Sequence, residues 1–440
     1  MPRTPPRFLI VVPTRNRADL ASAAVASVLR QAGDDVHLVV SDNSTQAEAS
    51  RRLDRLREGP DARRIRLVRP PEPLPMGRHW DWALGESLRL EPDTTHVLYL
   101  TDRMVFRSGG LQALLGVAAR HPDHVISCNL DRVDDASRPV RLEQNRWSGA
   151  VIELRAAHLL AMTARFELHR CLPAMLNTVV PRGILDRIRE RFGGVFDSIS
   201  PDFCFAYRCL SVVDTILYVD RAPLIHYATA RSNGASMARG IPTADSLDFR
   251  RNLDAPLNFA TPAPAIPTPG NAVLHEYGVV KRAAATPPFP DIDLPRYLRG
   301  LRWELEAIED PALKDDLVRR LEEQADALRR AGVTVNLDLR PPPPPPLAAR
   351  LARVLRAPGL LADRASRELR ALRRRLARLA WQVFRAPPPA DCDLPLEFDS
   401  TADALAHGDR APRGPVQDLS HLAPLDGRTV EPAPGASLSP

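Results

Sequence analysis

Residues 95–111 read THVLYLTDRMVFRSGGL, and this stretch decides the fold. Val97–Leu100 is a short apolar run of strand-favouring residues, which predicts a strand buried on both faces. The run ends at once in Thr101-Asp102-Arg103, and a helix is predicted to follow. In open α/β sheets, ligands bind in the crevice at the carboxyl ends of the strands. Asp102 is therefore a candidate ligand-binding residue, with a turn-capping role as the alternative.

Strand and helix patterns alternate on both sides of this stretch. Apolar runs predict four more strands, at Phe8–Val12, Val36–Val40, Ile65–Val68 and Val125–Cys128. Apolar residues at helical spacing lie between them. We therefore expect an α/β fold with a mostly parallel, Rossmann-like sheet and helices on both faces.

Three of the predicted strands end in polar clusters. The clusters are Thr14-Arg15-Asn16, Asp42-Asn43-Ser44 and Thr101-Asp102-Arg103. A sheet that only packs has no need of acids and guanidiniums at three strand ends. The first strand is not followed by GxGxxG and the sequence has no P-loop motif, which disfavours both of those nucleotide sites.

The net charge of +6 over 440 residues is unevenly distributed. Residues 347–386 carry eleven arginines against Asp363 and Glu368, a net +9, so the rest of the chain carries −3. The body is therefore not expected to bind nucleic acid. The five cysteines include no CxxC pair, and no apolar run approaches the roughly 18 residues of a membrane span, so we expect a cytoplasmic protein.

The segment PTRNRADLASAAVASVLRQ, followed by LVVSDNST, resembles the opening of the family 2 glycosyltransferases, which have the GT-A fold. Three later segments resemble further motifs of that family: PMGRHWDWAL flanks the donor, LYLTDRMVF stands at the Asp-x-Asp metal motif, and SPDFCFAYRCL stands at the catalytic base. The resemblance covers residues 6–240.

This resemblance implies a nucleotide-sugar donor and a set of residues that bind it. That set is Pro13, Thr14, Arg15, Asn16, Asp42, Asn43, Arg78, Asp102, His226 and Arg231. The resemblance also implies that Asp202 is the catalytic base. Local rules alone favour a plainer role for Asp202, because an acid in a first helical turn complements the helix dipole.

The sequence departs from the family motif at Arg103, where a second metal-binding acid would stand. A hard cation prefers several oxygen ligands, and Asp102 beside a guanidinium offers few. Three interpretations stay open. In the first, Asp102, water and diphosphate oxygens hold Mn²⁺ or Mg²⁺ weakly. In the second, Arg103 clamps the leaving diphosphate, as a catalytic residue. In the third, Arg103 is a surface residue and the metal site is lost.

Composition predicts further segments after a transferase domain at residues 1–240. They are a Pro-rich linker at 241–295, a helical segment at 296–335, a polyproline spacer at 336–346, a basic amphipathic helix at 347–386 and a disordered tail at 387–440. The basic helix is expected to lie on an anionic membrane surface, which would make the protein peripheral at the inner face. Pairing with another helix and contact with nucleic acid are the alternatives.

Together these features predict an inverting transfer of a sugar to a hydroxyl of a glycan, lipid-linked or small-molecule acceptor. Asp202 would take the hydroxyl proton, and Arg103 or a metal at Asp102 would stabilise the leaving diphosphate. The alternative is a catalytically inactive nucleotide-binding scaffold that recruits partners or membrane through its Pro-rich basic tail. The missing second acid favours that alternative.

Overall fold

The computed structural model describes residues 6–58, 61–253, 257–284, 289–339, 395–410, 414–415 and 420–432. The expected basic helix at 347–386 and most of the expected spacer at 336–346 lie outside these residues. The chain divides into a unit of residues 1–337 and 397–440, which is the subject below, and a unit of residues 338–396 of which only the ends are described. Within the described part, no helix is both long and apolar enough to cross a bilayer.

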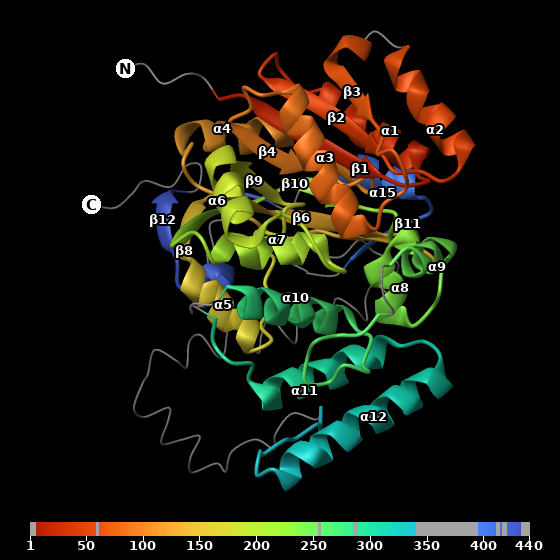
Figure 1. Ribbon diagram of the computed structural model, residues 1–440, viewed down its shortest axis with the longest axis vertical. Helices are drawn as coiled ribbons and strands as arrows, with labels where there is room; N and C mark the ends of the chain where they lie inside the picture. Colours follow the sequence, from red (N-terminus) through yellow and green to blue (C-terminus); the bar gives the residue numbers. More distant parts are fainter. Residues whose placement is uncertain are drawn as a thin grey trace, which may run out of the picture. The chain divides into compact units, whose positions relative to one another are not determined.

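The described residues form one sheet of 12 strands, whose main path is β12-β8-β10-β6-β9-β4-β1-β2-β3. The strands are β1 (Phe8–Thr14), β2 (Val36–Asp42), β3 (Ile65–Val68), β4 (His96–Tyr99), β5 (Met104–Phe106), β6 (Ile126–Asp134), β7 (Val140–Glu143), β8 (Val151–Arg155), β9 (Thr178–Pro181), β10 (Thr215–His226), β11 (Leu396–Phe398) and β12 (Arg428–Glu431). β4, β1, β2 and β3 pair in parallel, as do β6 and β10, while β9 runs antiparallel to β4 and β6. The carboxyl ends of β1, β2 and β4 therefore meet at one end of the sheet (Figure 1).

Helices cover both faces of this sheet. They are α1 (Ala18–Leu29), α2 (Ala47–Asp54), α3 (Met76–Leu90), α4 (Gly110–Arg120), α5 (Ala156–Ala164), α6 (Arg182–Phe192), α7 (Pro201–Leu210), α8 (Asn233–Arg239), α9 (Ala244–Arg251), α10 (Pro269–Ala283), α11 (Leu294–Glu304), α12 (Pro311–Arg330) and α15 (Thr401–Arg410). Successive side chains of a strand point to opposite faces, so Leu9 and Val11 enter one hydrophobic core while Ile10 and Val12 enter the other. Helices α3, α5–α7 and α10–α12 contribute to the first core, and α1, α2 and α4 to the second. The expected α/β fold is confirmed.

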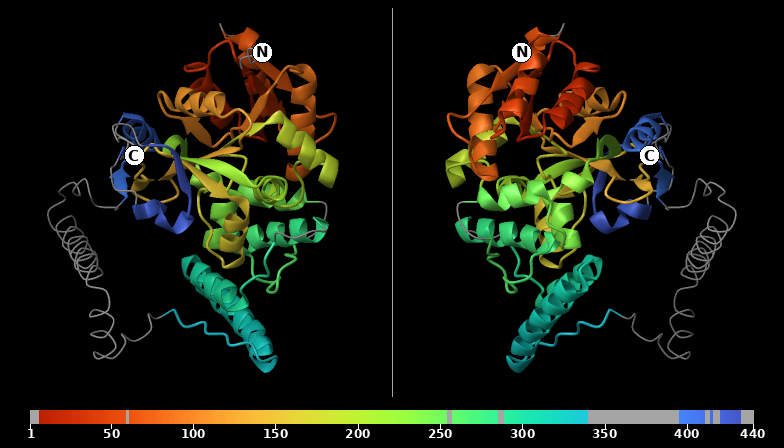
Figure 2. Two further views of the ribbon diagram at one scale, coloured as in Figure 1. Left: turned by 90° about the vertical axis from the view of Figure 1, so that its left-hand side faces the viewer. Right: turned by 90° about the vertical axis from the view of Figure 1, so that its right-hand side faces the viewer.

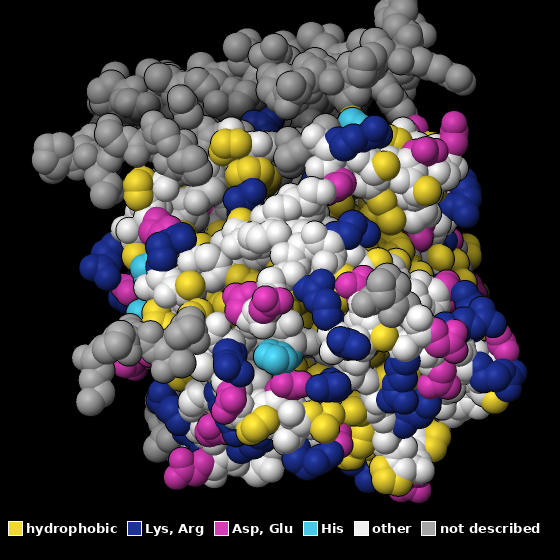
Figure 3. Space-filling view, turned by 90° about the horizontal axis from the view of Figure 1, so that it is seen from above, with side chains coloured by type: hydrophobic (Ala, Val, Ile, Leu, Met, Phe, Trp, Pro, Cys, Tyr) yellow, Lys and Arg dark blue, Asp and Glu magenta, His cyan; other side chains and the backbone are white. Residues whose placement is uncertain are grey.

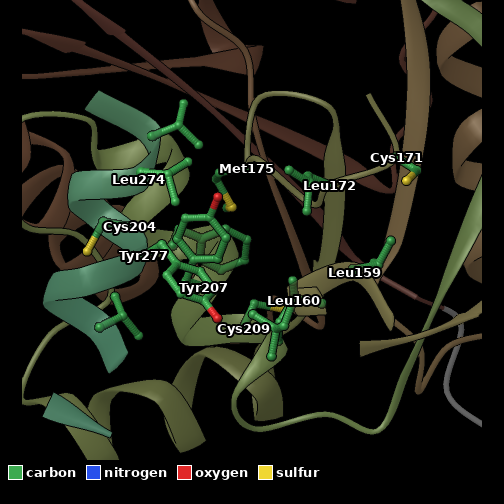
Figure 4. Packing of buried hydrophobic residues seen from close by; sticks show 14 of the residues in the cluster. Leu159, Leu160, Cys171, Leu172, Met175, Cys204, Tyr207, Cys209, Leu274 and Tyr277 are labelled. Atoms are coloured by element: carbon green, nitrogen blue, oxygen red, sulfur yellow. The ribbon is translucent and has the colours of Figure 1, made fainter. Parts of the chain in front are cut away.

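Helix α7 is held against α10 by a buried aromatic pair. The rings of Tyr207 and Tyr277 meet edge to face, with their centroids 5.3 Å apart. Figure 4 shows this pair among Cys204, Leu274 and other buried side chains of the first core. Such a pair contributes about 0.5–1.5 kcal/mol beyond its area burial. The pair joins the second half of α7 to the middle of α10.

Residues 241–295 differ from the expected linker, because they form α9 and α10. Thr243 begins α9 with a capping box, in which its side chain accepts from the backbone of Ser246 and the Ser246 side chain accepts in return. Thr268 caps α10, and Pro269 occupies its first turn. Proline is favoured at that position, where the missing N–H has no helical partner. Part of the proline content therefore marks helix starts instead of a linker.

Residues 395–432 also differ from the expected disordered tail, since most of them pack on the sheet. β12 pairs with β8, β11 pairs with β7, and Figure 2 shows this segment in blue beside the strands of the second half of the sheet. Asp409 accepts hydrogen bonds from the Ser108 backbone and hydroxyl at 2.6 and 2.9 Å, and Glu431 binds Arg120 at 2.7 Å. Backbone pairing and a few ion pairs hold the segment, and composition does not reveal such contacts.

Charged side chains of both signs share the surface. On the face seen in Figure 3, Lys and Arg are interspersed with Asp and Glu. This mixture agrees with the small net charge of the chain outside residues 347–386.

Candidate active site

A cleft opens where β1 and β4 end. The two strands are parallel neighbours, so the residues that follow them come together. The Thr14 hydroxyl donates to Asp102 Oδ2 at 2.9 Å, and Arg17 Nη1 lies 3.6 Å from Asp102 Oδ1. Both Thr14 and Asp102 are buried. Polar clusters from separate strand ends thus form one connected site.

The loops after β1 and β2 are braced against each other. Asn16 adopts a positive φ of 55°, a conformation that asparagine tolerates better than most residues. Its Oδ1 accepts the backbone N–H groups of Thr45 and Gln46 at 2.9 and 3.0 Å. The Asn43 side chain exchanges two hydrogen bonds with the Leu74 backbone, at 2.7 and 2.9 Å. These loops, together with the loop after β4, are called the strand wall below.

Of the ten residues predicted to bind the donor, five do not line the cleft: Asn16, Asp42, Arg78, His226 and Arg231. Asp42 is buried, and its oxygens accept from Arg69 Nε at 2.7 Å and from the Ser44 backbone at 3.0 Å. Burial alone would raise the pKa of Asp42, but hydrogen bonds from Ser44 and Arg69 lower it below the ordinary value. Arg78 is exposed on α3 and does not line the cleft, whereas its neighbours His79 and Trp80 do. Asp42 therefore anchors the loop after β2.

Residues of α8 and α9 form the facing side of the cleft. These two helices, together with α7 and α10 beside them, are called the helical wall below. Helix α9 places Asp248 2.7 Å from Arg15 Nε, and Asp245 3.1 Å from Arg17 Nε. Arg231 also binds Asp245, at 3.0 Å from its Nε, and does not line the cleft. The cleft thus brings together six predicted residues and several that sequence reasoning missed. The six are Pro13, Thr14, Arg15, Asn43, Asp102 and Arg103, and the others include Arg17, Thr101, Asn233, Asp245 and Asp248.

Arg103 stands where the cleft meets a second cavity, called the chamber below. Its Nη1 donates to His226 Nε2 at 2.8 Å, so His226 accepts through a neutral ring. Burial, then the Arg103 charge, lowers the pKa of His226 well below its ordinary value. Burial and the neighbouring Arg17 charge lower the pKa of Arg103 to about 10, so it stays a cation at neutral pH. No carboxylate among the described residues lies within ion-pair distance of Arg103. Arg103 lines both cavities, so the third interpretation is wrong about its location on the surface.

Three buried polar atoms at this junction have no hydrogen-bond partner among the described residues. They are Thr101 Oγ1, Arg103 Nε and Asn233 Oδ1, and each residue lines both the cleft and the chamber. Buried polar atoms in native proteins are nearly always paired, so a cluster of unpaired ones calls for an explanation. A polar ligand at the junction would bring hydrogen-bonding groups next to these three residues.

Asp202 faces the chamber from the start of α7. Ser200 precedes the helix, and Pro201 and Asp202 lie in its first turn. Burial raises the pKa of Asp202 to about 6. Glu276 of α10 accepts the Ser200 backbone N–H at 2.8 Å, and burial raises the pKa of Glu276 to about 8. An ionised Asp202 at neutral pH can accept a proton from a hydroxyl in the chamber.

The residues around Asp102 do not fit a divalent metal. One Asp102 oxygen accepts from Thr14, and the other lies 3.6 Å from the Arg17 guanidinium, whose positive charge disfavours a cation at this carboxylate. No group of three or more His, Cys, Asp or Glu side chains with the geometry for a metal occurs in the part of the chain that the structure describes. Of the three interpretations, the geometry favours Arg103 as the group that meets a diphosphate.

Residues 9–174 match the model of the family Glycosyl transferase family 2. The resemblance to that family is thereby confirmed over this segment, which carries a family 2 glycosyltransferase domain. No curated protein matches the chain.

Several solved structures are similar in part. S. aureus TarS is 13% identical at a TM-score of 0.39, over 73% of this chain and 53% of that one, so this chain spans about half of it. TarS 1–349 in complex with UDP-GlcNAc is 11% identical at a TM-score of 0.40, over 74% and 92% of the two chains. The mannosyltransferase PcManGT from Pyrobaculum calidifontis, in complex with GDP-Man and Mn²⁺, is 15% identical at a TM-score of 0.42, over 82% of each chain. The assignment above rests on the family match alone.

Proposed function

We propose that this protein transfers a sugar from a nucleotide-sugar donor to a hydroxyl acceptor with inversion at the anomeric carbon. The observation that carries the proposal is the junction at Arg103. The cleft, lined by Arg15, Arg17 and Arg103, meets there the chamber, which contains the Asp202 carboxylate. The residues at this junction include three with a buried polar atom that has no partner among the described residues. The family match supports the reaction class.

In this proposal the nucleotide lies along the strand wall, and its diphosphate points to Arg103. Arg15 and Arg17 line the same cleft, and the diphosphate competes for them with Asp248 and Asp245 of α9. A fixed guanidinium stabilises charge that develops on a departing diphosphate, because it needs no reorganisation during the reaction. The sugar then occupies the junction, where Thr101 and Asn233 can bond its hydroxyls.

Asp202 acts as the base on the opposite side. The acceptor oxygen forms a bond to the anomeric carbon while the bond from that carbon to the diphosphate breaks. Asp202 takes the hydroxyl proton, and the nucleoside diphosphate leaves. One displacement of this kind inverts the configuration. In this proposal Arg103 stabilises the leaving diphosphate in place of a metal, since the Arg17 charge beside Asp102 repels a cation.

Asp202→Asn tests the base. We expect kcat to fall by about 10²–10⁴, the usual contribution of a general base, while calorimetry shows nearly unchanged nucleotide binding. In the wild type, kcat/KM should fall as the pH drops through about 6, because Asp202 must be ionised. Asp186→Asn, on the exposed side of α6, is the matched control. Turnover of the Asp202 variant within a few-fold of the wild type would remove Asp202 from the mechanism.

A panel of UDP- and GDP-sugars, scored for hydrolysis and transfer, tests the activity itself. Nucleotide binding without any turnover would favour the alternative of an inactive scaffold. Attachment to an anionic membrane, or to a helical partner, through residues 347–386 remains a separate proposal. It is motivated by the net charge of +9 in that segment.

A further inference from the structure

The chamber beside Asp202 differs in chemistry from the cleft that it adjoins. The two cavities share six residues at their junction: Met76, Trp80, Thr101, Arg103, Asn233 and Phe249. Beyond the junction, side chains from several separate elements close around a cavity of about 310 Å³. Most of them are apolar, and they include Leu130, Leu176, Ile199, Met237, Ala272 and Val273.

The ionisable groups of the chamber are neighbours of one another. Arg103 bonds His226 at 2.8 Å, and its charge acts on Asp202. The chamber therefore has one polar end, at the reacting groups, and an apolar body. Among the described residues that line the chamber, those with an unpaired buried polar atom are Thr101, Arg103 and Asn233, which stand at the junction.

A ligand body that is rich in hydroxyls suits this chamber poorly. Each hydroxyl that is buried without a hydrogen-bond partner costs about 1–3 kcal/mol, and a sugar ring carries several. Each Å² of apolar surface removed from water contributes about 25 cal/mol instead. A cavity of about 310 Å³ lies at the lower end of the range for small-molecule sites.

We propose that the acceptor is a hydroxyl on a small aliphatic or aromatic body, which fills the chamber and places its oxygen at Asp202. This inference rests on the proposed function, whose acceptor it specifies. The sugar and diphosphate stay at the polar junction. The product is a glycoside of a hydrophobic alcohol, together with a nucleoside diphosphate and the proton that Asp202 has accepted.

Binding experiments that need no turnover test this proposal. The probe is 1-naphthol, an aromatic alcohol, titrated by fluorescence into the full-length protein, with glucose and maltose as polar counterparts in calorimetry. We expect saturable binding of 1-naphthol and none of the two sugars. Sugar binding that excludes 1-naphthol, or the lack of saturable 1-naphthol binding, would overturn the proposal.

Met237→Glu locates the probe. Met237 lies on α8 in the chamber wall, outside the cleft, and is only half-buried, so the variant should fold. We expect it to weaken 1-naphthol binding at least tenfold and to leave UDP or GDP binding unchanged. Met237→Leu should bind 1-naphthol within about threefold of the wild type, and Leu247→Glu, at an exposed site on α9, should match the wild type. Unchanged binding in Met237→Glu would overturn the proposal.

The same experiments separate this inference from the proposed function. If 1-naphthol binds as expected but no donor supports transfer, the proposed function fails while the chamber preference stands. If transfer to sugars occurs and 1-naphthol neither binds nor reacts, the acceptor proposal fails and the function stands.

Discussion

The strand wall and the helical wall of the cleft are built on different principles. The strand wall consists of loops that follow parallel strands, and its polar residues come within a few positions of each strand end. The helical wall consists of helices. Its part in the site depends on which of their side chains lie opposite Arg15 and Arg17. Asp245 and Asp248 reach Arg17 and Arg15 across more than 220 residues of sequence. The first wall is thus encoded locally, and the second is encoded by long-range ion pairs.

Among the variants that test this difference between the walls, Arg103→Ala in the strand wall has the largest expected effect. We expect kcat to fall by about 10²–10³, as it does when one strong donor to a developing anion is lost. EDTA should reduce wild-type turnover by less than about tenfold. Arg103→Asp should create metal dependence. Inactivation of the wild type by EDTA, with Arg103→Ala nearly neutral, would show that a metal stabilises the diphosphate and that Arg103 only borders the site.

Glu276→Gln probes the support of the helical wall. The folded protein raises the pKa of Glu276 from 4.5 to about 8. Its stabilising, protonated form is present below pH 4.5 and is lost as the pH rises through about 8. Glutamine is neutral at every pH and still accepts the Ser200 N–H. Relative to the wild type, the variant should therefore gain about 2–4 °C in Tm between pH 5 and pH 8, equivalent to about 1 kcal/mol. An identical Tm difference at both pH values would contradict this assignment.

Asp248→Asn has the smallest expected effect, and it tests the ion pair that joins the helical wall to the strand wall. The carboxylate of Asp248 competes with a diphosphate for Arg15, and both side chains are partly exposed. Removing the charge should raise UDP or GDP affinity about two- to fivefold, in line with a partly exposed ion pair. Asp186→Asn again serves as the control. A loss of affinity would mean that Asp248 holds Arg15 in its binding position.

The local encoding of the strand wall explains what sequence reasoning could reach. Thr14, Arg15, Asn43, Asp102 and Arg103 follow predicted strands, and the structure gathers them in one cleft. Asp42 shows the limit of this reasoning. A strand-end acid looks the same in sequence whether it faces a ligand or, as here, an internal arginine.

The helical wall could not be predicted from the sequence, for a different reason. Its prolines and polar residues resemble a linker until they are recognised as helix caps, such as Thr243 and Thr268. Even a correct helix prediction would not have shown that α9 faces the strand ends. That information resides in the pairing of Asp245 with Arg17 and Arg231, which no local pattern contains.

The pairing of β12 with β8 has a consequence for how the protein is made. Arg428 bonds Glu153 across 275 residues of sequence. At about 5–20 residues per second, a ribosome needs roughly 15–55 s to bring β12 out after β8 has been synthesised. Throughout that time β8 presents an unpaired strand edge, which is a template for aggregation. The nascent chain therefore carries this exposed strand edge until β12 has been made.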